Sequence, residues 1–371
     1  MKKVCVITAA RSEYGLLRWI IDAIQNDPDF QLQLVVTGSH LSVEQGLTYH
    51  QIEDDGYHID EKIEMILSSE TSVGIAKSMG ICSIGISDCF NRLKPDIIVV
   101  LGDRYELLPI CNVALVMNIP IAHISGGDVT EGAIDDQVRN TVTMLSTLHF
   151  AGVEESADRI VRMRGSRQNV WTCGEPGLDN FRRLSLWDRS KLAKDLQIDE
   201  TKKWLMVSYH PETKISLERN MITIAWLQEA LDKIDNVEII ITRANADLGG
   251  IQINQYWENL VKKNGKKYKL FDSLGQLRYL SLMKETVCII GNSSSGIVEA
   301  PFIGIPAINI GCRQKGRHLC KNVISVNNED DNIYEILNKL LHDKHTDLTD
   351  KYYGDGHTSE QIKCKIKEFL C

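Results

Sequence analysis

Short runs of apolar, often β-branched residues alternate along the chain with segments in which apolar residues recur every three or four positions. The first pattern predicts buried strands, and the second predicts helices that pack on one face. Because the strand runs are apolar throughout, we expect parallel sheets covered by helices on both faces. In the first half of the chain, the pattern predicts strands at residues 4–8, 32–37, 96–101 and 120–123 and helices at residues 14–25, 72–92, 105–117 and 135–145.

The alternation weakens near residues 174–186, where Gly174, Pro176 and Gly177 cluster, and then restarts. It predicts further strands at residues 204–208, 237–242, 286–290 and 307–310 and helices at residues 274–282, 293–302, 331–341 and 359–370. We therefore expect an α/β protein with two doubly wound, Rossmann-like domains that face a cleft. The expected bounds are 1–178 for the first domain, 179–355 for the second, and 356–371 for a C-terminal helix that packs back on the body.

Composition and charge narrow the possible functions. The 371 residues are 43% hydrophobic and 25% charged, a globular balance that excludes a disordered chain, a collagen-like repeat or a coiled coil. The net charge is −8 and no long basic cluster is present, so nucleic acid is not an expected partner. No apolar run approaches the roughly 20 residues of a membrane helix, and residues 4–7 are too short for a signal peptide. We expect no membrane partner and a cytoplasmic location.

The cysteines and glycines indicate neither a metal nor a cofactor. None of the 10 cysteines forms a Cys-x-x-Cys pair, and most lie inside apolar runs, where cysteine behaves as a small buried hydrophobe. The first predicted strand leads into Ala9-Ala10-Arg11 and not into the Gly-x-Gly-x-x-Gly turn of a dinucleotide-binding protein. Arg11 lies where a helix begins, a natural place to meet an anion.

Acidic residues gather after two neighbouring predicted strands. The strand at 96–101 is followed by Gly-Asp-Arg-Tyr-Glu, and the strand at 120–123 leads into a Gly-rich, acidic segment. Together these segments supply Asp103, Arg104, His123, Asp128, Glu131, Asp135 and Asp136. Each acid alone is explained by helix capping. Their density favours general acid/base chemistry, because crowded carboxylates raise each other's pKa.

The second half carries the features of a diphosphate site. The strand at 286–290 leads into Gly-Asn-Ser-Ser-Ser-Gly, where amides and hydroxyls at a helix start would cradle a diphosphate. No Gly-Lys-Ser/Thr follows, so this is not a Walker A loop. Glu299 is placed to accept ribose hydroxyls, and Arg313 would neutralise phosphate charge. Further polar residues follow other strands of this half, and these are His210, Asn245 and Asp247.

In their order and spacing, five segments resemble those of UDP-N-acetylglucosamine 2-epimerases, especially the hydrolysing branch of sialic-acid biosynthesis. These segments are GDRYE, HISGGDVTEGAIDDQVR, YHPET, GNSSSGIVEAP and INIGCRQKGR. The resemblance implies a glycosyltransferase-B-like fold and the hydrolysis of UDP-N-acetylglucosamine to N-acetylmannosamine and UDP. In the family, a base removes the C2 proton while UDP leaves C1. Water then adds to C1 of the 2-acetamidoglucal, and C2 is reprotonated on the other face.

Carried over by position, the resemblance gives Asp103 and Asp135 acid/base roles. With the residues named above, the candidate catalytic set is Asp103, Asp128, Glu131, Asp135 and His210. The candidate substrate-binding set is Arg11, Arg104, His123, Asn245, Asp247, Asn292, Ser293, Ser294, Ser295, Gly296, Glu299 and Arg313. The expected partner is a UDP-sugar, and the family implies a homodimer or homotetramer.

The chain also departs from the family pattern. Ser125 stands where some members carry a catalytic glutamate, so that role passes to Asp128 or Glu131 or is absent. Asn140 replaces a common histidine, and Cys312 replaces an aspartate or threonine, which would fit a different sugar. Four alternatives stay open: hydrolysis of UDP-N,N′-diacetylbacillosamine for legionaminic acid, a non-hydrolysing epimerase, a retaining glycosyltransferase of the same fold, and a regulator that only binds nucleotide-sugars.

Overall fold

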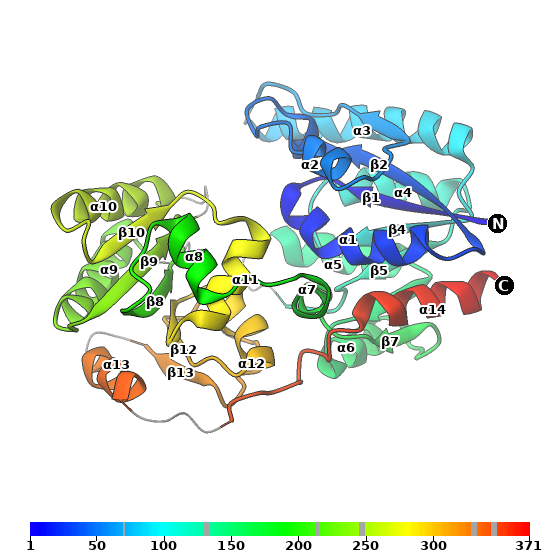
Figure 1. The fold of residues 1–371 in the computed structure, drawn as a ribbon. Coiled ribbons are helices and arrows are strands. Elements are labelled where there is room, and N and C mark those ends of the chain that lie inside the picture. The colour runs from blue at the N-terminus through cyan, green and yellow to red at the C-terminus, as the bar shows by residue number, and fades with distance from the viewer. Residues whose placement is uncertain (70, 130–133, 213–214, 245–248, 328–331, 343–346) are drawn as a thin grey trace. The chain divides into compact units, whose positions relative to one another are not determined.

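A computed structural model of the chain describes residues 1–69, 71–129, 134–212, 215–244, 249–327, 332–342 and 347–371. The chain divides into two compact units (Figure 1). Unit 1 comprises Met1–Arg182 and Gly354–Cys371, and unit 2 comprises Arg183–Tyr353. Each unit has its own parallel sheet, so the expected pair of doubly wound sheets is confirmed.

Unit 1 contains a seven-stranded parallel sheet in the order β3-β2-β1-β4-β5-β6-β7. Its strands are β1 (Lys2–Thr8), β2 (Phe30–Thr37), β3 (Glu61–Ile63), β4 (Ile97–Leu101), β5 (Ile121–Ile124), β6 (Leu148–Ala151) and β7 (Val170–Thr172). The strand order reverses between β1 and β4. The carboxyl ends of these two strands therefore form a topological switch point, where ligands of such sheets bind.

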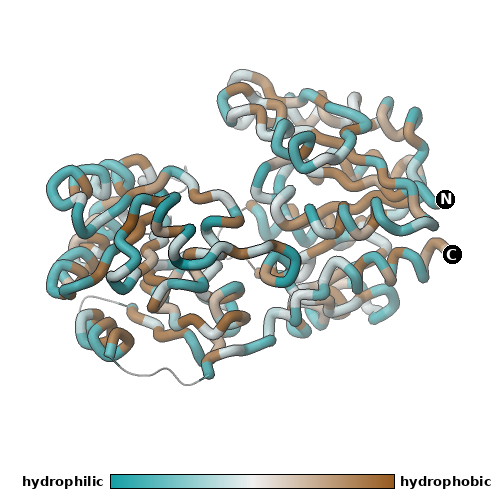
Figure 2. Tube along the Cα trace, in the orientation of Figure 1, coloured by the Kyte–Doolittle hydropathy of each residue, from teal (hydrophilic) through white to brown (hydrophobic). Residues whose placement is uncertain are grey.

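Helices cover both faces of this sheet. They are α1 (Arg11–Gln25), η1 (Gly38–Leu41), α2 (Tyr49–Asp54), α3 (Ser72–Leu93), α4 (Leu107–Val116), α5 (Ile134–Leu145), α6 (Glu154–Arg164), η2 (Pro176–Leu178), α7 (Asp179–Arg183) and α14 (Thr358–Leu370). Val4 and Val6 of β1 pack with α1 and α14, whereas Cys5 and Ile7 pack with α3, α4 and α5. Successive strand residues point to opposite faces of the sheet. The apolar strands, brown in Figure 2, therefore contribute side chains to the hydrophobic core on each face.

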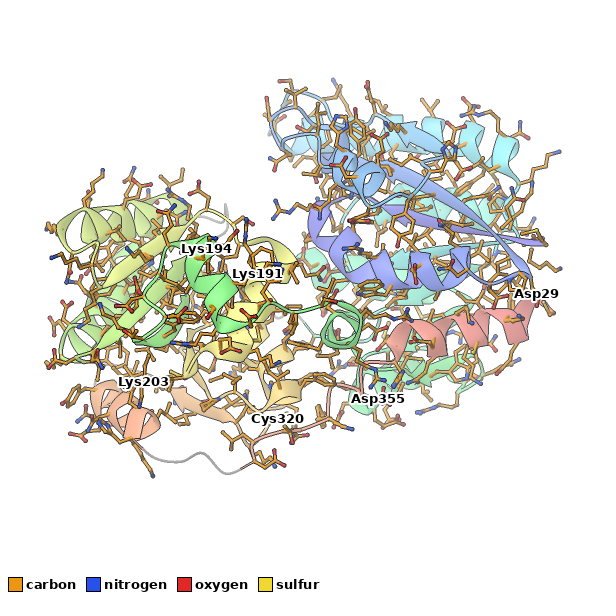
Figure 3. The ribbon with its side chains drawn as sticks, in the orientation of Figure 1. Asp29, Lys191, Lys194, Lys203, Cys320 and Asp355 are labelled. Atoms are coloured by element: carbon orange, nitrogen blue, oxygen red, sulfur yellow. The ribbon has the colours of Figure 1, made fainter. Side chains whose placement is uncertain are left out.

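The C-terminal helix α14 completes unit 1. Its first two backbone N–H groups donate to the carboxylate of Asp179, at 2.9 and 2.8 Å. Near its other end, Lys367 pairs with Asp27 and with Asp29, which is labelled in Figure 3. Ile362 is fully buried in the same core as α1. Capping, ion pairs and apolar burial therefore all attach this terminal segment to the first sheet.

Unit 2 contains a six-stranded parallel sheet in the order β10-β9-β8-β11-β12-β13. The strands are β8 (Lys203–Ser208), β9 (Val237–Thr242), β10 (Tyr268–Phe271), β11 (Cys288–Gly291), β12 (Ala307–Ile310) and β13 (Val323–Val326). The helices are α8 (Arg189–Leu196), α9 (Leu217–Asp232), α10 (Gly250–Lys263), α11 (Gly275–Glu285), η3 (Ser294–Gly296), α12 (Glu299–Ile303) and α13 (Ile333–His342). The order reverses between β8 and β11, which gives this sheet its own switch point.

The helix expected at residues 293–302 is wrong as a single element. The segment forms the 3₁₀ turn η3 and then the short helix α12. Ser293 caps the turn, because its hydroxyl accepts from the N–H of Ser295 at 3.4 Å and competes with helix formation. Pro301 lacks an N–H and is tolerated only in the first turn of a helix, so the α-helix begins two residues before it.

Helix α3 has the length and mean hydropathy of a possible membrane helix, although charged residues interrupt its apolar positions. Among the described residues it is the one helix that is long and apolar enough to cross a membrane by length and composition alone. Its inner residues Cys82, Ile86 and Phe90 pack in the core of unit 1. A core helix passes the same test, and α3 is therefore weak evidence for a membrane span.

Gly127 offers a test of the backbone geometry after β5. Its φ is +78°, and a Cβ there would lie 2.2 Å from the carbonyl oxygen of Ser156 in α6. We expect Gly127→Ala to destabilise unit 1 by roughly 2–4 kcal/mol, from backbone strain plus overpacking. The matched control is Gly80→Ala in α3, where a Cβ would meet open space. This substitution should stabilise unit 1 by roughly 0.5–1 kcal/mol, because alanine is favoured over glycine inside a helix. Urea unfolding of both variants measures this, and equal effects would contradict the assignment.

Candidate functional site

A pocket of about 510 Å³ lies in unit 1 at the switch point of the sheet. Its walls come from the start of α1, the loop after β4 and the first turn of α5. The lining residues are Ser12, Glu13, Leu16, Leu101, Gly102, Asp103, Arg104, Tyr105, Ile134 and Asp135. The pocket thus brings together three residues singled out from the sequence, Asp103, Arg104 and Asp135.

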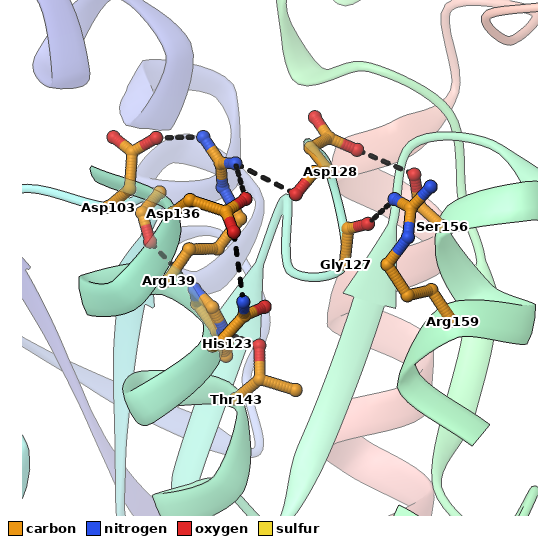
Figure 4. A network of polar contacts seen from close by, with 11 residues as sticks. Asp103, His123, Gly127, Asp128, Asp136, Arg139, Thr143, Ser156 and Arg159 are labelled. Carbon is orange, nitrogen blue, oxygen red and sulfur yellow. Dashed lines mark hydrogen bonds and ion pairs between the residues drawn. The ribbon is translucent and has the colours of Figure 1, made fainter. Parts of the chain in front are cut away.

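Arg139 of α5 organises the carboxylates around this pocket (Figure 4). One guanidinium nitrogen donates to the Asp103 carboxylate. Another donates to the backbone carbonyl of Asp128 at 2.8 Å and lies 4.0 Å from the Asp136 carboxylate. The Arg139 side chain is only 7% exposed. The crowded negative charge expected from the sequence is therefore offset by a buried positive charge. The sequence suggests Asp135, four residues before Arg139, as the partner of this arginine, and it does not predict the contact with Asp103.

The Asp128 carboxylate has a structural partner. It accepts a hydrogen bond of 2.6 Å from the Ser156 hydroxyl at the start of α6. Among the described residues, those that line the pocket do not include Asp128. The structure therefore places this carboxylate beside α6, while the Asp128 backbone carbonyl contributes to the Arg139 network.

His123 is buried inside unit 1 and contacts the loop after β4, which forms part of the pocket wall. Its Nε2 lies 2.8 Å from the carbonyl oxygen of Gly102, and its Nδ1 lies 3.2 Å from the Thr143 hydroxyl. Burial lowers the pKa of His123 to about 4, so the ring is neutral at pH 7. Its contacts suit a residue that positions the loop after β4, and they differ from the substrate contact expected from the sequence.

A second polar network, missed in the sequence, borders the pocket near α1. Arg104 donates to the buried carboxylate of Glu106 at 2.6 Å. Glu13 accepts from the backbone N–H groups of Ala9 and Ala10, at 2.7 and 3.1 Å. The only sequence signal for Glu13 was its place five residues after the end of a predicted strand, just before a predicted helix.

At the switch point of unit 2, Asn292 clamps His210. The Asn292 side chain accepts from the His210 N–H at 2.7 Å and donates to the His210 carbonyl at 2.8 Å. Asn292 is fully buried, so both polar atoms of its side chain serve this clamp. Its structural role is to fix His210 at the end of β8. A direct contact between the Asn292 side chain and a ligand was the sequence expectation, and the structure favours positioning instead.

The serine-rich turn after β11 gathers hydroxyls and one buried carboxylate. The Tyr279 hydroxyl lies beside Ser208, Ser293 and Ser295, and burial of this hydroxyl raises the pKa of Tyr279. The Glu299 Oε2 atom is buried without a hydrogen-bond partner, and burial raises the pKa of this carboxyl. Donors and acceptors for a polyhydroxylated, phosphorylated ligand therefore lie together here.

Arg313 belongs to the same end of the sheet. Its guanidinium donates to the Asn292 carbonyl at 3.2 Å, and Gln314 donates to the same oxygen at 2.8 Å. The Glu212 carboxylate accepts from the N–H of Cys312 at 3.1 Å. Gly311 has a φ of +78°, and a Cβ there would lie 1.9 Å from Glu212 Oε1, so a side chain would be strained and would displace this carboxylate. The loops after β8, β11 and β12 are thus bound to one another.

The remaining candidates are placed as follows. Arg11 is exposed at the first position of α1, Ser294 begins η3, and Gly296 is buried against β12. Glu131, Asn245 and Asp247 lie outside the described residues. Within the described part of the chain, no group of three or more His, Cys, Asp or Glu side chains is arranged to hold a metal ion.

Comparison with known proteins identifies the family. The family model described as UDP-N-acetylglucosamine 2-epimerase matches residues 22–367. The chain belongs to the UDP-N-acetylglucosamine 2-epimerase family. This membership accounts for the two Rossmann-like units, and it places the pocket of unit 1 and the serine-rich turn of unit 2 in an enzyme family that acts on nucleotide-sugars.

Individual relatives narrow the comparison. The chain is 41% identical to the GDP/UDP-N,N′-diacetylbacillosamine 2-epimerase (hydrolyzing) of Campylobacter jejuni, over 91% of this chain and 87% of the relative. It is 33% identical to polysialic acid biosynthesis protein P7 of Escherichia coli, over 100% and 95%. The solved UDP-GlcNAc 2-epimerase of Neisseria meningitidis bound to UDP-GlcNAc has a TM-score of 0.78 at 17% identity, covering 99% and 100% of the two chains. That likeness supports a glycosyltransferase-B-like fold.

The buried histidines of unit 1 give a pH prediction. Burial lowers the pKa values of His40, His123 and His149 to about 4, 4 and 3. These values lie below the roughly 6.5 of an unfolded histidine. The stability that the neutral rings contribute is therefore present above that pH and is lost as the pH falls towards 4.

We expect the ring NMR signals of these three histidines to stay in their neutral positions from pH 8 down to about pH 5. The ring signals are a better measurement than the pH dependence of overall stability. Burial raises the pKa of Glu13 to about 7, so this carboxyl changes the stability of the fold with pH in the opposite direction. Titration of the three rings near pH 6.5 would contradict their buried placement.

Proposed function

We propose that the protein is a hydrolysing 2-epimerase that acts on UDP-N,N′-diacetylbacillosamine and releases UDP and the free sugar inverted at C2. The observation that carries the proposal is the pocket of unit 1, where Asp103 and Asp135 line the switch point of a sheet in a chain of this family. The choice of sugar rests on the 41% identical Campylobacter jejuni relative, whose name gives that sugar linked to GDP or UDP.

The reaction requires acid/base groups at the sugar and a site that stabilises the departing diphosphate. A carboxylate takes the C2 proton, the C2–H electron pair forms the C1=C2 double bond, and the C1–O bond breaks as the nucleotide leaves. Water then gives its oxygen to C1 and a proton returns to C2. Asp103 and Asp135 are our candidates for the proton transfers, and both must reach the same substrate during turnover.

We assign the nucleotide to the switch point of unit 2. Hydroxyls of Ser293, Ser294 and Ser295, at the turn after β11, would donate to the diphosphate, and Arg313 would supply positive charge. The unpartnered Glu299 carboxylate would accept the ribose hydroxyls. Desolvation of this carboxylate is costly unless a donor reaches it, and a ribose would satisfy that need.

UDP-N-acetylglucosamine is the second candidate substrate. The relative named for polysialic acid biosynthesis, at 33% identity over the whole chain, favours it. The two sugars differ at C4 and C6, away from the reacting carbons C1 and C2, so one set of acid/base groups serves either. The difference between the candidates is therefore one of sugar recognition and leaves the proposed chemistry unchanged.

The proposal is tested by incubating the purified protein with each nucleotide-sugar in deuterated water. We expect free sugar and nucleoside diphosphate from the diacetylbacillosamine substrate, with deuterium at C2, and slower release from UDP-N-acetylglucosamine. The GDP-linked form of the first sugar is run in parallel. An epimer that stays attached to the nucleotide, or release only in the presence of an acceptor, would overturn the proposal. NMR follows all of these products.

Asp103→Asn is expected to lower kcat about 10²- to 10⁴-fold, because an amide cannot transfer the proton. Nucleotide affinity, measured by calorimetry with UDP, should change little, because the proposed nucleotide site lies in unit 2. The control is Asp54→Asn, which changes an exposed aspartate of the same unit. Full activity of Asp103→Asn would exclude Asp103 from the reaction.

A further inference from the structure

Glu13 is a buried carboxyl group in the wall of the pocket of unit 1. The residue is 6% exposed, and it is one of the three α1 residues that line the pocket. Neither the strand-end motifs nor the family resemblance drew attention to it. Buried carboxyl groups are rare in proteins unless they are paired, so its presence beside Asp103 needs a physical explanation.

Helix capping accounts for only one of the two oxygens of the Glu13 carboxyl group. Oε2 accepts the N–H groups of Ala9 and Ala10 and so satisfies the start of α1. Oε1 is buried and has no hydrogen-bond partner. A capping role does not require the second oxygen to be buried without a partner, and an unsatisfied buried oxygen costs roughly 1–3 kcal/mol. A proton on Oε1 would remove the cost of leaving a buried carboxylate oxygen without a donor.

The surroundings of Glu13 favour the protonated form near neutral pH. Burial raises the pKa of Glu13 to about 7, the nearby Glu106 carboxylate acts in the same direction, and Arg104 and the two backbone donors oppose it. The titratable and charged groups nearest to it, from the loop after β4, from α5 and from η1, are Asp103, Arg104, Tyr105, Glu106, Asp135 and His40. A group with this pKa both holds and releases a proton at physiological pH.

Glu13 and Asp135 approach the pocket from opposite sides of the sheet. Helix α1 packs on one face of the sheet, and α5 packs on the other. Both helices contribute to the pocket wall, with Asp103 of the β4 loop as a further lining residue. A sugar ring that binds between these two walls of the pocket would have a carboxyl group on each side. Inversion at C2 requires that geometry, because the proton leaves from one face and returns to the other.

We propose that Glu13 is the general acid that returns a proton to C2 of the sugar, on the face opposite the carboxylate that removed it. This inference rests on the proposed hydrolysing 2-epimerase function. It supplies a third carboxyl group in a chain where Ser125 replaces the glutamate of some family members.

The step balances as follows. The C1=C2 electron pair of the glycal forms a new C2–H bond with the Glu13 proton, and Glu13 becomes a carboxylate. The oxygen of water bonds to C1, and the water loses its proton to whichever of Asp103 and Asp135 did not take the C2 proton. These two carboxyl groups then release their protons to solvent, and Glu13 takes one up, which restores all three groups. No oxidant, metal or cofactor enters the step.

Glu13→Gln tests this assignment without removing the helix cap, because the amide oxygen of glutamine can still accept from Ala9 and Ala10. We expect the variant to eliminate the nucleotide but to protonate C2 poorly. It should release free glycal, and sugar formation at pH 6 should fall about 100-fold or more. The matched control is Glu106→Gln, which perturbs the same buried network from outside the pocket lining and should not release glycal. NMR of the products measures the ratio of glycal to sugar.

The wild-type enzyme gives an independent measurement that needs no variant. Its ratio of glycal to sugar should rise as the pH increases through about 7, because Glu13 then loses the proton it donates. This rise should be absent in Glu13→Gln. A wild-type ratio that does not change with pH, or a folded Glu13→Gln variant with no increase in glycal, overturns the role of Glu13 alone. If the wild-type enzyme releases neither nucleotide nor sugar from any substrate tested, the proposed function fails as well.

Discussion

The buried guanidinium of Arg139 holds the functional end of unit 1 together. It ties three segments that are separate in sequence, because it binds Asp103 after β4, the Asp128 carbonyl after β5, and Asp136 in its own helix. Removing one partner of such a buried pair typically costs about 3–5 kcal/mol, because the other charge is then left uncompensated. The geometry of the Asp103 carboxylate therefore depends on α5 as much as on its own loop.

In unit 2 an uncharged side chain, that of Asn292, connects the loops in a similar way. Asn292, after β11, binds both backbone groups of His210 after β8, and its own carbonyl receives Arg313 and Gln314 from the loop after β12. In unit 2 this tie crosses the switch point between β8 and β11, whereas in unit 1 the Arg139 contacts join the loops after β4 and β5, on one side of the switch point. Such a tie rigidifies the loops without occupying the space in which a ligand would bind.

The sequence predicted the long-range plan well, because buried parallel strands are continuous apolar runs that remain visible without any tertiary information. It missed five strands of only three or four residues, which are β3, β6, β7, β10 and β13. It also missed the helices α2, α6, α8, α9 and α10. It also predicted one helix where Ser293 and Pro301 divide the segment into two. Motifs located Asp103 and Asp135, but no local pattern reveals that Arg139 reaches Asp103, 36 residues away.

The surroundings of the carboxyl groups also bear on the different roles proposed for them in one small pocket. Asp103 is paired with a guanidinium and is therefore suited to remain a carboxylate, whereas Glu13 is held by two backbone amides in a site where burial favours the neutral acid. A reaction that removes a proton and later returns it needs both forms at the same pH. Different surroundings, rather than different side-chain chemistry, separate base from acid. The fold supplies those surroundings from opposite faces of one sheet, which is why a pocket at the strand ends is suited to inversion at a single carbon.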